Sequence, residues 1–404
     1  MRPSTTRSVR SPSAATRAAA GLCSLIAGAV VLGACAPPGA APPADELARG
    51  REIFRHETFG NEHFWTDTLH MERVVQGAVD PTTALSVGLK VDMDALPPEV
   101  VQGIQQGQVD LRSPATTVTL LKLNAVVGLR GTVQTVGGRD TLTRLGITCA
   151  LCHSTVDDAF APGIGHRMDG WPNRDLNVGA IVALSPGVPE AQKAVYRSWG
   201  PGKYDPRFNV DGQSTPLVLP PAYGLAQVRN ETYTAEGPIS YWNAYVAVTQ
   251  MHGRGNFSDP RLGIHVTHTP DLVTPLLPAL RAYQHSLAAP PPPAGSFDAA
   301  AAARGRSTFM ARCAGCHTGA RLTDNNRGVL HDPAETGMSP AYAARTANRR
   351  YRTTPLRGLW QHPPYFHDGS AATLRDVVDH YDRVRGLNLT EEQKRDLVEF
   401  LKTL

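Results

Sequence analysis

Two copies of the pattern C-x-x-C-H carry most of the chemistry that this chain of 404 residues can perform. The first copy spans residues 149–153 and the second spans residues 313–317. At this spacing the two cysteines can bond a haem as thioethers, and the histidine next to them can bind the iron as its proximal ligand. A thioredoxin-like redox pair or part of a zinc site uses similar cysteines, but two copies favour two haems. The predicted attachment residues are Cys149, Cys152 and His153 for the first haem c, and Cys313, Cys316 and His317 for the second.

The two remaining cysteines, Cys23 and Cys35, lie in the N-terminal segment. Residues 1–34 hold four arginines and then an apolar run, which is the composition of a secretory signal peptide. The ending Leu-Gly-Ala-Cys resembles a bacterial lipobox, which implies lipidation of Cys35; an ordinary signal peptide is the alternative. Ala36 after this cysteine implies sorting to the outer membrane. Because bacteria attach haem c outside the cytoplasm, we expect a lipid-anchored protein of the cell envelope that faces the periplasm.

The charge balance says little about the partners of this protein. The formal net charge of +4 equals the number of arginines in residues 1–34, so the rest of the chain is close to neutral. No basic tract or interleaved aromatic patch indicates nucleic-acid binding. After the signal peptide, no apolar stretch is long enough to cross a bilayer. Because the chain contains 37 glycines and 33 prolines, we expect long loops.

Two Pro-rich stretches predict the domain organisation. Residues 35–46 should form a tether behind the lipid anchor. Residues 288–296 include four consecutive prolines and should form a stiff linker. The expected domains are therefore an N-terminal haem domain over residues 47–287 and a C-terminal cytochrome c domain over residues 297–404.

An internal repeat supports this division. Residues 48–54 (ARGREIF) match residues 303–309 (ARGRSTF). In the second copy the haem motif comes almost at once, but in the first copy it comes only at Cys149. This resembles the cytochrome c pattern, in which an N-terminal helix with a glycine and an aromatic residue leads into the haem motif. Residues 55–146 therefore look like an insertion, to which the sequence assigns no function.

Periodicity predicts a mainly α fold with long loops. The resemblance to the cytochrome c pattern implies two cytochrome c-like haem lobes, the first with this N-terminal insertion. Helices are expected over residues 63–75 and 371–384, and another should open after Thr390, which can cap it. A glycine-rich turn is expected at Gly137-Gly138.

The string PYFHDGSAATL, residues 364–374, resembles a motif of the bacterial di-haem cytochrome c peroxidase family. That family includes the related enzyme that matures methylamine dehydrogenase. The resemblance covers roughly residues 145–404, whereas residues 55–144 have no counterpart in the standard peroxidases. It implies that the first haem is the reaction site and that the second haem exchanges electrons.

For the first haem, the resemblance implies roles for His166 and Trp242. His166 ends an Ile-Gly-His string and would be a distal ligand that can leave the iron; a surface loop histidine is the alternative. Trp242, in Tyr-Trp-Asn-Ala, would relay electrons between the haems; a core aromatic residue is the alternative.

One departure from the family concerns the acid–base group. Peroxide cleavage needs a base that moves a proton from the near to the far oxygen of HOOH. The family uses a Glu about ten residues after a Gln, and here Pro260 stands at that position relative to Gln250. The available substitutes are Asp259, Glu236 and His252, of which His252 is close to Gln250 in sequence and titrates in the right range.

For the second haem, the family places a Met, and the maturation enzyme a Tyr, where Tyr381 stands here. A phenolate favours ferric or higher oxidation states, whereas a thioether favours ferrous iron. His380 and Met338 are rival ligands, and Tyr381 as a buried helix aromatic is the structural alternative. The resemblance further implies that Arg357 and His367 bond haem propionates.

The family also holds a calcium ion between its lobes, for which Asn173 and Thr354 are the nearest matches. The order of Asn173 and Arg174 is swapped relative to the family pattern.

The sequence thus predicts a di-haem c-type oxidoreductase, most simply peroxidase-like. Its expected partners are peroxide or O₂ as oxidant and a small redox protein or cytochrome as electron donor or acceptor. Two alternatives remain open. One is a di-haem oxygenase acting on an apolar substrate in a channel shaped by the insertion. The other is an electron carrier with both irons six-coordinate.

Overall fold

Helices supply most of the regular structure, as predicted, and the strands form only two-stranded sheets within the described residues. The computed structural model describes residues 42–404, so the predicted signal peptide, Cys35 and most of the tether lie outside this range. The helices are α1 (Ala44–His56), α2 (Met71–Ala78), α3 (Pro81–Ser86), α4 (Pro98–Gln105), α5 (Pro114–Lys122), α6 (Ala150–His153), α7 (Val178–Val182), α8 (Glu190–Arg197), α9 (Phe208–Asp211), α10 (Ile239–Tyr245), α11 (Leu277–Ser286), α12 (Ala299–Arg312), α13 (Pro333–Thr336), α14 (Pro340–Ala343), α15 (Leu374–Arg385) and α16 (Glu391–Lys402). Short helical turns lie between them, including π-helical turns η1 (His63–Thr68) and η3 (Val246–Gln250).

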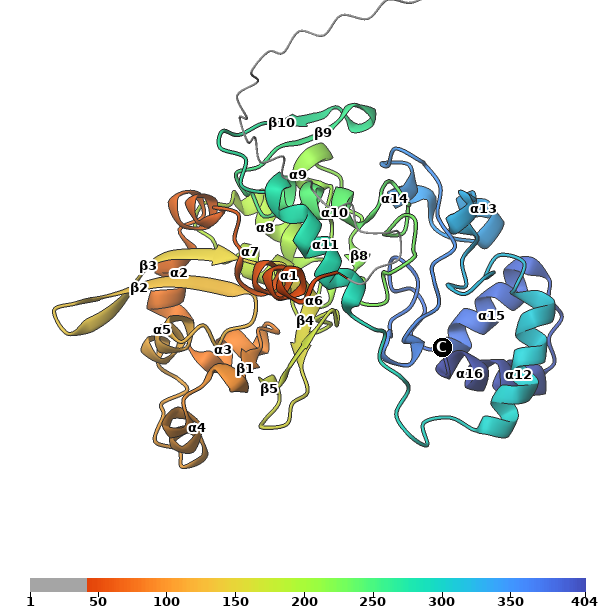
Figure 1. The fold of residues 1–404 in the computed structure, drawn as a ribbon, viewed down its shortest axis with the longest axis horizontal. Coiled ribbons are helices and arrows are strands. Elements are labelled where there is room, and N and C mark those ends of the chain that lie inside the picture. Colours follow the sequence, from red (N-terminus) through yellow and green to blue (C-terminus); the bar gives the residue numbers. More distant parts are fainter. Residues whose placement is uncertain (1–41) are drawn as a thin grey trace, which may run out of the picture. The chain divides into compact units, whose positions relative to one another are not determined.

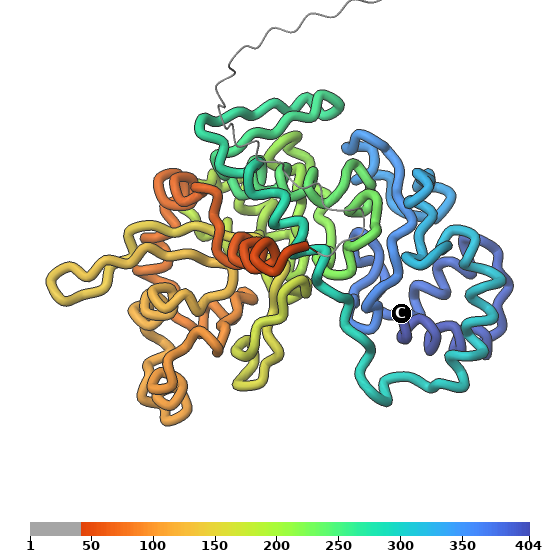
Figure 2. Tube along the Cα trace, in the orientation of Figure 1, coloured from red at the N-terminus to blue at the C-terminus, as the bar shows by residue number. Residues whose placement is uncertain are grey.

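The strands pair locally. They are β1 (Val91–Asp92), β2 (Leu129–Val136), β3 (Arg139–Ile147), β4 (Ser154–Val156), β5 (Ile164–Gly165), β6 (Arg167–Asp169), β7 (Lys203–Tyr204), β8 (Leu217–Val218), β9 (Phe257–Asp259) and β10 (Ile264–Val266). The longest sheet is the β2–β3 hairpin, whose antiparallel register runs from Leu129 opposite Ile147 to Val136 opposite Arg139. Its turn is the predicted Gly137-Gly138, where both glycines have positive φ. Figure 2 shows this hairpin projecting from the rest of the insertion.

The sequence repeat is also a structural repeat. The first copy lies on α1, which packs against α11, and the second lies on α12, which packs against α16 (Figure 1). Each crossing is closest at the repeated glycine. A Cβ added to Gly50 would lie 2.1 Å from the backbone oxygen of Ala279, and one added to Gly305 would lie 1.9 Å from that of Asp396. Both positions therefore require glycine, because the helices approach to backbone contact.

The repeated aromatic residue completes each crossing. The ring of Phe54 lies 5.6 Å from that of Tyr283, and the ring of Phe309 lies 5.1 Å from that of Phe400. Such pairs add to the apolar burial that holds the crossing together. Each lobe thus has an N-terminal helix crossing a C-terminal helix, which confirms the expected fold class of two cytochrome c-like lobes.

The insertion between α1 and the first haem motif contains α2 to α5, β1, β2 and β3 (Figure 1). The expected single helix over residues 63–75 is wrong, because His70 has φ +55 and separates η1 from α2. The insertion rests directly on the first haem motif. Gly128, with φ +79, approaches so closely that a Cβ would lie 2.1 Å from Cα of Leu151.

The C-terminal helices begin at capping boxes. Thr373 caps α15 together with Asp376, so this helix starts three residues after the predicted Ala371. Thr390 and Gln393 cap α16 as predicted. In both, the N-cap hydroxyl accepts from the N3 backbone N–H while the N3 side chain accepts from the N-cap N–H.

Helix α1 lies across one expected domain boundary, and a loop lies at another. Helix α1 begins at Ala44 and ends at His56, so it takes the last residues of the predicted tether and the first two of the predicted insertion. No helix or strand forms over residues 288–296, which connect α11 to α12 as an extended loop (Figure 2). Residues 42–404 nevertheless cluster as a single unit. Within this range no helix has the length and apolarity needed to span a bilayer.

Substituting Gly305→Ala should destabilise the C-terminal lobe, because the added methyl group would force α12 away from α16. Overpacking of this kind costs about 1–3 kcal/mol. Gly77→Ala is the matched control, since Gly77 lies on the exposed face of α2 with open space around it and alanine favours helix. Thermal unfolding of the two variants measures the difference. Equal melting temperatures would contradict the close crossing.

Candidate haem sites

A single continuous cavity of about 840 Å³ touches both haem motifs within residues 42–404. Its wall includes all six predicted attachment residues, which are Cys149, Cys152, His153, Cys313, Cys316 and His317. The first motif lies on α6 and the turn before it, and the second comes directly after α12. Two haems bound to these residues would share one interior space.

The two proximal histidines are held in the same way. Nδ1 of His153 lies 3.0 Å from the carbonyl oxygen of Pro220, and Nδ1 of His317 lies 3.0 Å from that of Leu322. A carbonyl oxygen can only accept, so Nδ1 must donate and carry the proton. Nε2 is then left with a free lone pair. Burial also lowers the pKa of both imidazoles, that of His153 to about 4. A neutral imidazole with bare Nε2 is the form that binds haem iron.

No disulfide joins the four motif cysteines. Burial raises the pKa of Cys149 and Cys152 to about 12, and that of Cys313 to about 11. A redox-active cysteine requires a lowered pKa, because the thiolate is the reacting form. The environment therefore opposes a thioredoxin-like redox pair.

Three arginines on the cavity wall, buried Arg352 and half-buried Arg174 and Arg357, have few carboxylates near them. Arg352 and Arg357 share one carboxylate, Glu231, at 3.3 and 3.5 Å. Within residues 42–404, Arg174 has no carboxylate at ion-pair distance, and Nε of both Arg174 and Arg352 is buried without a partner. Burial lowers the pKa of these two guanidinium groups. A buried unpaired cation is costly, so the cavity is suited to anionic groups such as haem propionates.

Both predicted propionate partners, Arg357 and His367, line the cavity. Arg357 donates through Nη1 to the carbonyl oxygen of Gly224 at 2.9 Å. Nε2 of His367 lies 3.1 Å from the hydroxyl of Tyr351. Arg174 was not predicted, because its lack of a counter-ion is visible only once the surrounding chain is folded.

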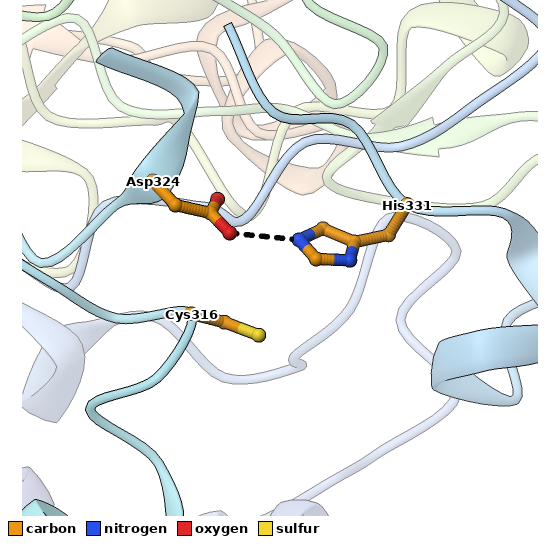
Figure 3. A group of neighbouring side chains, drawn as sticks. All are labelled: Cys316, Asp324 and His331. Atoms are coloured by element: carbon orange, nitrogen blue, oxygen red, sulfur yellow. Dashed lines mark hydrogen bonds and ion pairs between the residues drawn. The ribbon is translucent and has the colours of Figure 1, made fainter. Parts of the chain in front are cut away.

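Near the second motif, the side chains of Cys316, Asp324 and His331 converge (Figure 3). Their ligand atoms lie within 4.8 Å of one another, and Nε2 of His331 lies 3.0 Å from Oδ2 of Asp324. Because Cys316 is the predicted haem-attachment thiol, this group adjoins the candidate second haem site.

Of the three candidate acid–base residues, only His252 lines the cavity. Burial, with a smaller contribution from His63, lowers the pKa of His252 to about 4, so its imidazole is neutral at physiological pH. Neither ring nitrogen makes a hydrogen bond within the described residues. Asp259 instead accepts from the Tyr241 hydroxyl at 2.6 Å, and Glu236 is ion-paired with buried Arg207.

His166 lies outside the cavity wall. Its side chain is 53% exposed, and its Nδ1 lies 2.9 Å from a carboxylate oxygen of Asp94 in the insertion. This placement does not fit the distal ligand that the Ile-Gly-His string implied, and it agrees with the alternative of a surface loop histidine. The Ile-Gly-His string is present, but its loop places the His166 side chain in solvent.

Trp242 and Gln250 both line the cavity, on α10 and η3. The indole Nε1 of Trp242 is buried without a hydrogen-bond partner among residues 42–404. Gln250 is held in place, since its Oε1 accepts from the Tyr204 hydroxyl at 2.8 Å. A buried indole N–H with no protein acceptor fits a wall that a polar or anionic ligand group completes.

Tyr381 lines the cavity beside the second motif. Burial, and to a smaller extent Cys316 and Cys313, raises its pKa to about 12. Its hydroxyl makes no hydrogen bond within residues 42–404. His380 is not on the cavity wall, and its Nε2 lies 2.8 Å from the carbonyl oxygen of Thr336. Met338 does reach the wall.

The two predicted calcium ligands differ in placement. Asn173 is buried away from the cavity wall, and its Oδ1 has no partner in the described range, while its Nδ2 donates to the carbonyl oxygen of Gly88 at 2.8 Å. Thr354 is exposed and lines the cavity. A free amide oxygen is suited to Ca²⁺, but nothing in the described residues joins Asn173 and Thr354 in one site.

Comparison with known proteins gives the C-terminal lobe a family. The cytochrome c family pattern matches residues 302–404, so covalently bound haem c is the cofactor of this lobe. The chain is 31% identical over 121 residues to the methylamine utilization protein MauG of Methylorubrum extorquens. It is 36% identical over 66 residues to a cytochrome-c peroxidase of Denitromonas iodatirespirans. These similarities confirm the resemblance to the di-haem cytochrome c peroxidase family.

The similarity is partial. The matched segments cover 24% and 14% of this chain, and 32% and 18% of the two relatives. Two solved structures are similar at 21% identity and a TM-score of 0.34 each. They are a hydrazine synthase of Kuenenia stuttgartiensis pressurized with xenon, covering 52% of this chain and 78% of that chain, and a MauG-like protein associated with microbial copper homeostasis, covering 48% and 75%.

Replacing both cysteines of one motif should remove one haem. We expect the haem-to-protein ratio to fall from two to one in Cys149→Ser/Cys152→Ser, because neither thioether can form. The corresponding pair Cys313→Ser/Cys316→Ser should also retain one. Absorbance of the reduced pyridine complex, divided by protein concentration, measures the ratio. A ratio of one in the unmodified protein would contradict the assignment of two haem sites.

Proposed function

We propose that this protein is a di-haem c-type oxidoreductase in which peroxide reacts at the first haem and the second haem exchanges electrons with a donor. The balance is HOOH + 2 e⁻ + 2 H⁺ → 2 H₂O. The observation that carries the proposal is the single cavity joining two motifs whose histidines both present a bare Nε2. The haems would supply the electron storage and the oxidant binding.

In this proposal His252 performs the proton transfer. Its neutral imidazole would take the proton from the near oxygen of HOOH and return it to the far oxygen, so that water leaves as the O–O bond breaks. The support is threefold: His252 lines the cavity, its lowered pKa leaves it unprotonated, and no group of residues 42–404 occupies its ring nitrogens.

Tyr381 is proposed as the distal ligand of the second haem. Its hydroxyl has no hydrogen-bond partner within the described residues, and it lines the cavity next to Cys313 and Cys316. Phenolate ligation would favour a haem that holds oxidising equivalents. The raised pKa of Tyr381 means that the phenol would lose its proton only on binding iron.

His252→Gln should lower peroxide turnover by about 10²–10⁴-fold, the usual contribution of general acid–base catalysis. His166→Gln is the control and should leave turnover unchanged, because that side chain is exposed outside the cavity. Peroxide-dependent oxidation of a reduced cytochrome or dye by the holoprotein measures both. If instead His166→Gln abolishes turnover and His252→Gln does not, this assignment is wrong.

Tyr381→Phe should change the ferric absorption and EPR spectrum of the second haem, because its sixth ligand would be removed. The control is His380→Gln, since Nε2 of His380 already faces the carbonyl oxygen of Thr336. The spectrum of the first haem should stay the same in both variants. An unchanged spectrum in Tyr381→Phe would reject the phenolate ligand and leave Met338 as the candidate.

An oxygenase is the second candidate, because the cavity beyond the first motif is walled by apolar side chains. The lining residues there are Met71, Val75 and Val79 on α2 and just after it, and Val178, Ile181 and Val182 on α7. Stable binding of O₂ by the reduced first haem, with no turnover of peroxide, would favour this function over the peroxidase.

The proposed location rests on residues 1–35 alone. A cleaved signal peptide and lipidation of Cys35 would place the protein in the bacterial cell envelope, anchored to the outer membrane and facing the periplasm. A small redox protein or cytochrome there would be its electron partner.

A further inference from the structure

The insertion has a second contact region, at residues 59–65, which touches both the strand that leads into the first haem motif and the loop that carries His252. On one side, Asn61 accepts a hydrogen bond from the backbone N–H of Ile147 at 3.0 Å, and its Nδ2 donates to the carbonyl oxygen of Ile147 at 2.8 Å. Ile147 is the last residue of β3, two positions before Cys149. One buried side chain therefore fixes the strand that leads into the haem motif.

On its other side, the same segment holds the His252 loop by its backbone. The carbonyl oxygen of Phe59 accepts from the N–H of Arg254 at 2.8 Å. The indole Nε1 of Trp65 donates to the carbonyl oxygen of Met251 at 3.3 Å. These two bonds bracket His252, one before it and one after it.

The backbone at this contact is unusual on both sides. His252 has φ +60 and Phe59 has φ +56, a region that residues other than glycine seldom adopt. His252 lies just beyond π-helical turn η3, and Phe64 lies in π-helical turn η1. Conformations of this kind persist where the surroundings over-determine them, and they concentrate at functional sites.

The side chain of His252 is held by Phe64. The two rings are stacked, with centroids 3.6 Å apart and planes inclined by 18°. Both rings line the cavity. No hydrogen bond within the described residues orients the imidazole, so this stacking is the contact that we expect to restrain its plane.

We propose that Phe64 is a positioning residue that holds the His252 imidazole at the first haem cavity, so that the insertion forms part of the reaction site. The effect of Phe64 on catalysis rests on the proposed function, whereas the contact between Phe64 and His252 does not. It gives a role to a segment that has no counterpart in the standard peroxidases. Substrate and iron need not touch Phe64, because it acts through His252.

The first test is chemical labelling of the holoprotein with diethylpyrocarbonate, which modifies neutral accessible imidazoles, combined with peptide mass spectrometry. Phe64→Leu should raise the labelling rate of His252 by about two- to tenfold, the range that one stacked aromatic pair supports. Phe64→Tyr keeps the stack and should label like the unmodified protein. Phe160→Leu is the matched control, because Phe160 lies in the same lobe away from the cavity wall. His166 provides an internal standard.

The second test is a double-mutant cycle in peroxide turnover. Phe64→Leu should lower turnover in the unmodified background, Phe64→Tyr should restore it, and Phe64→Leu should change the remaining rate of His252→Gln by less than about twofold. If Phe64→Leu and His252→Gln lowered turnover independently, so that their effects added in the double variant, the inference would be overturned. Unchanged labelling of His252 in Phe64→Leu would also overturn it. If His252→Gln alone leaves turnover intact, the proposed acid–base role fails, whereas increased labelling in Phe64→Leu would still support the positioning contact.

Discussion

The fixed orientation of the two proximal imidazoles is the constraint on which the proposed chemistry depends. In each lobe one backbone carbonyl, that of Pro220 or Leu322, holds the proton on Nδ1 and leaves Nε2 free. Burial keeps both rings neutral. A charged or rotated imidazole could not bind iron, so the loops that carry these carbonyls are as necessary to the sites as the cysteines are.

The helix crossings supply the framework for those loops. Gly50 and Gly305 allow α1 to approach α11, and α12 to approach α16, to backbone contact. Both lobes contain this glycine-mediated helix crossing, but they differ in the segment between the first helix and the haem motif. In the C-terminal lobe the haem motif comes directly after α12, whereas in the N-terminal lobe the insertion comes first and then rests on the haem motif through Gly128.

The insertion makes the two candidate haem sites unequal. It contributes Phe64 and the apolar face of α2 to the cavity wall, and it holds the His252 loop through Phe59 and Trp65. The second site has no such addition within residues 42–404, and its wall includes Tyr381 from α15. One site is thus surrounded by apolar side chains and a neutral imidazole, and the other by a buried phenol, which suits the different roles proposed for them.

The amino-acid sequence alone determined the features that depend on local spacing: the two haem motifs, the repeated helix with its glycine and aromatic residue, and the cap at Thr390. A few consecutive residues specify each of these features. Only the tertiary structure decided which distant side chains meet the cavity. His166 is near the first motif in sequence yet faces solvent, whereas His252 reaches the cavity because residues 59–65 hold its loop there. Likewise, the unpaired charge of Arg174 exists only after burial removes it from water.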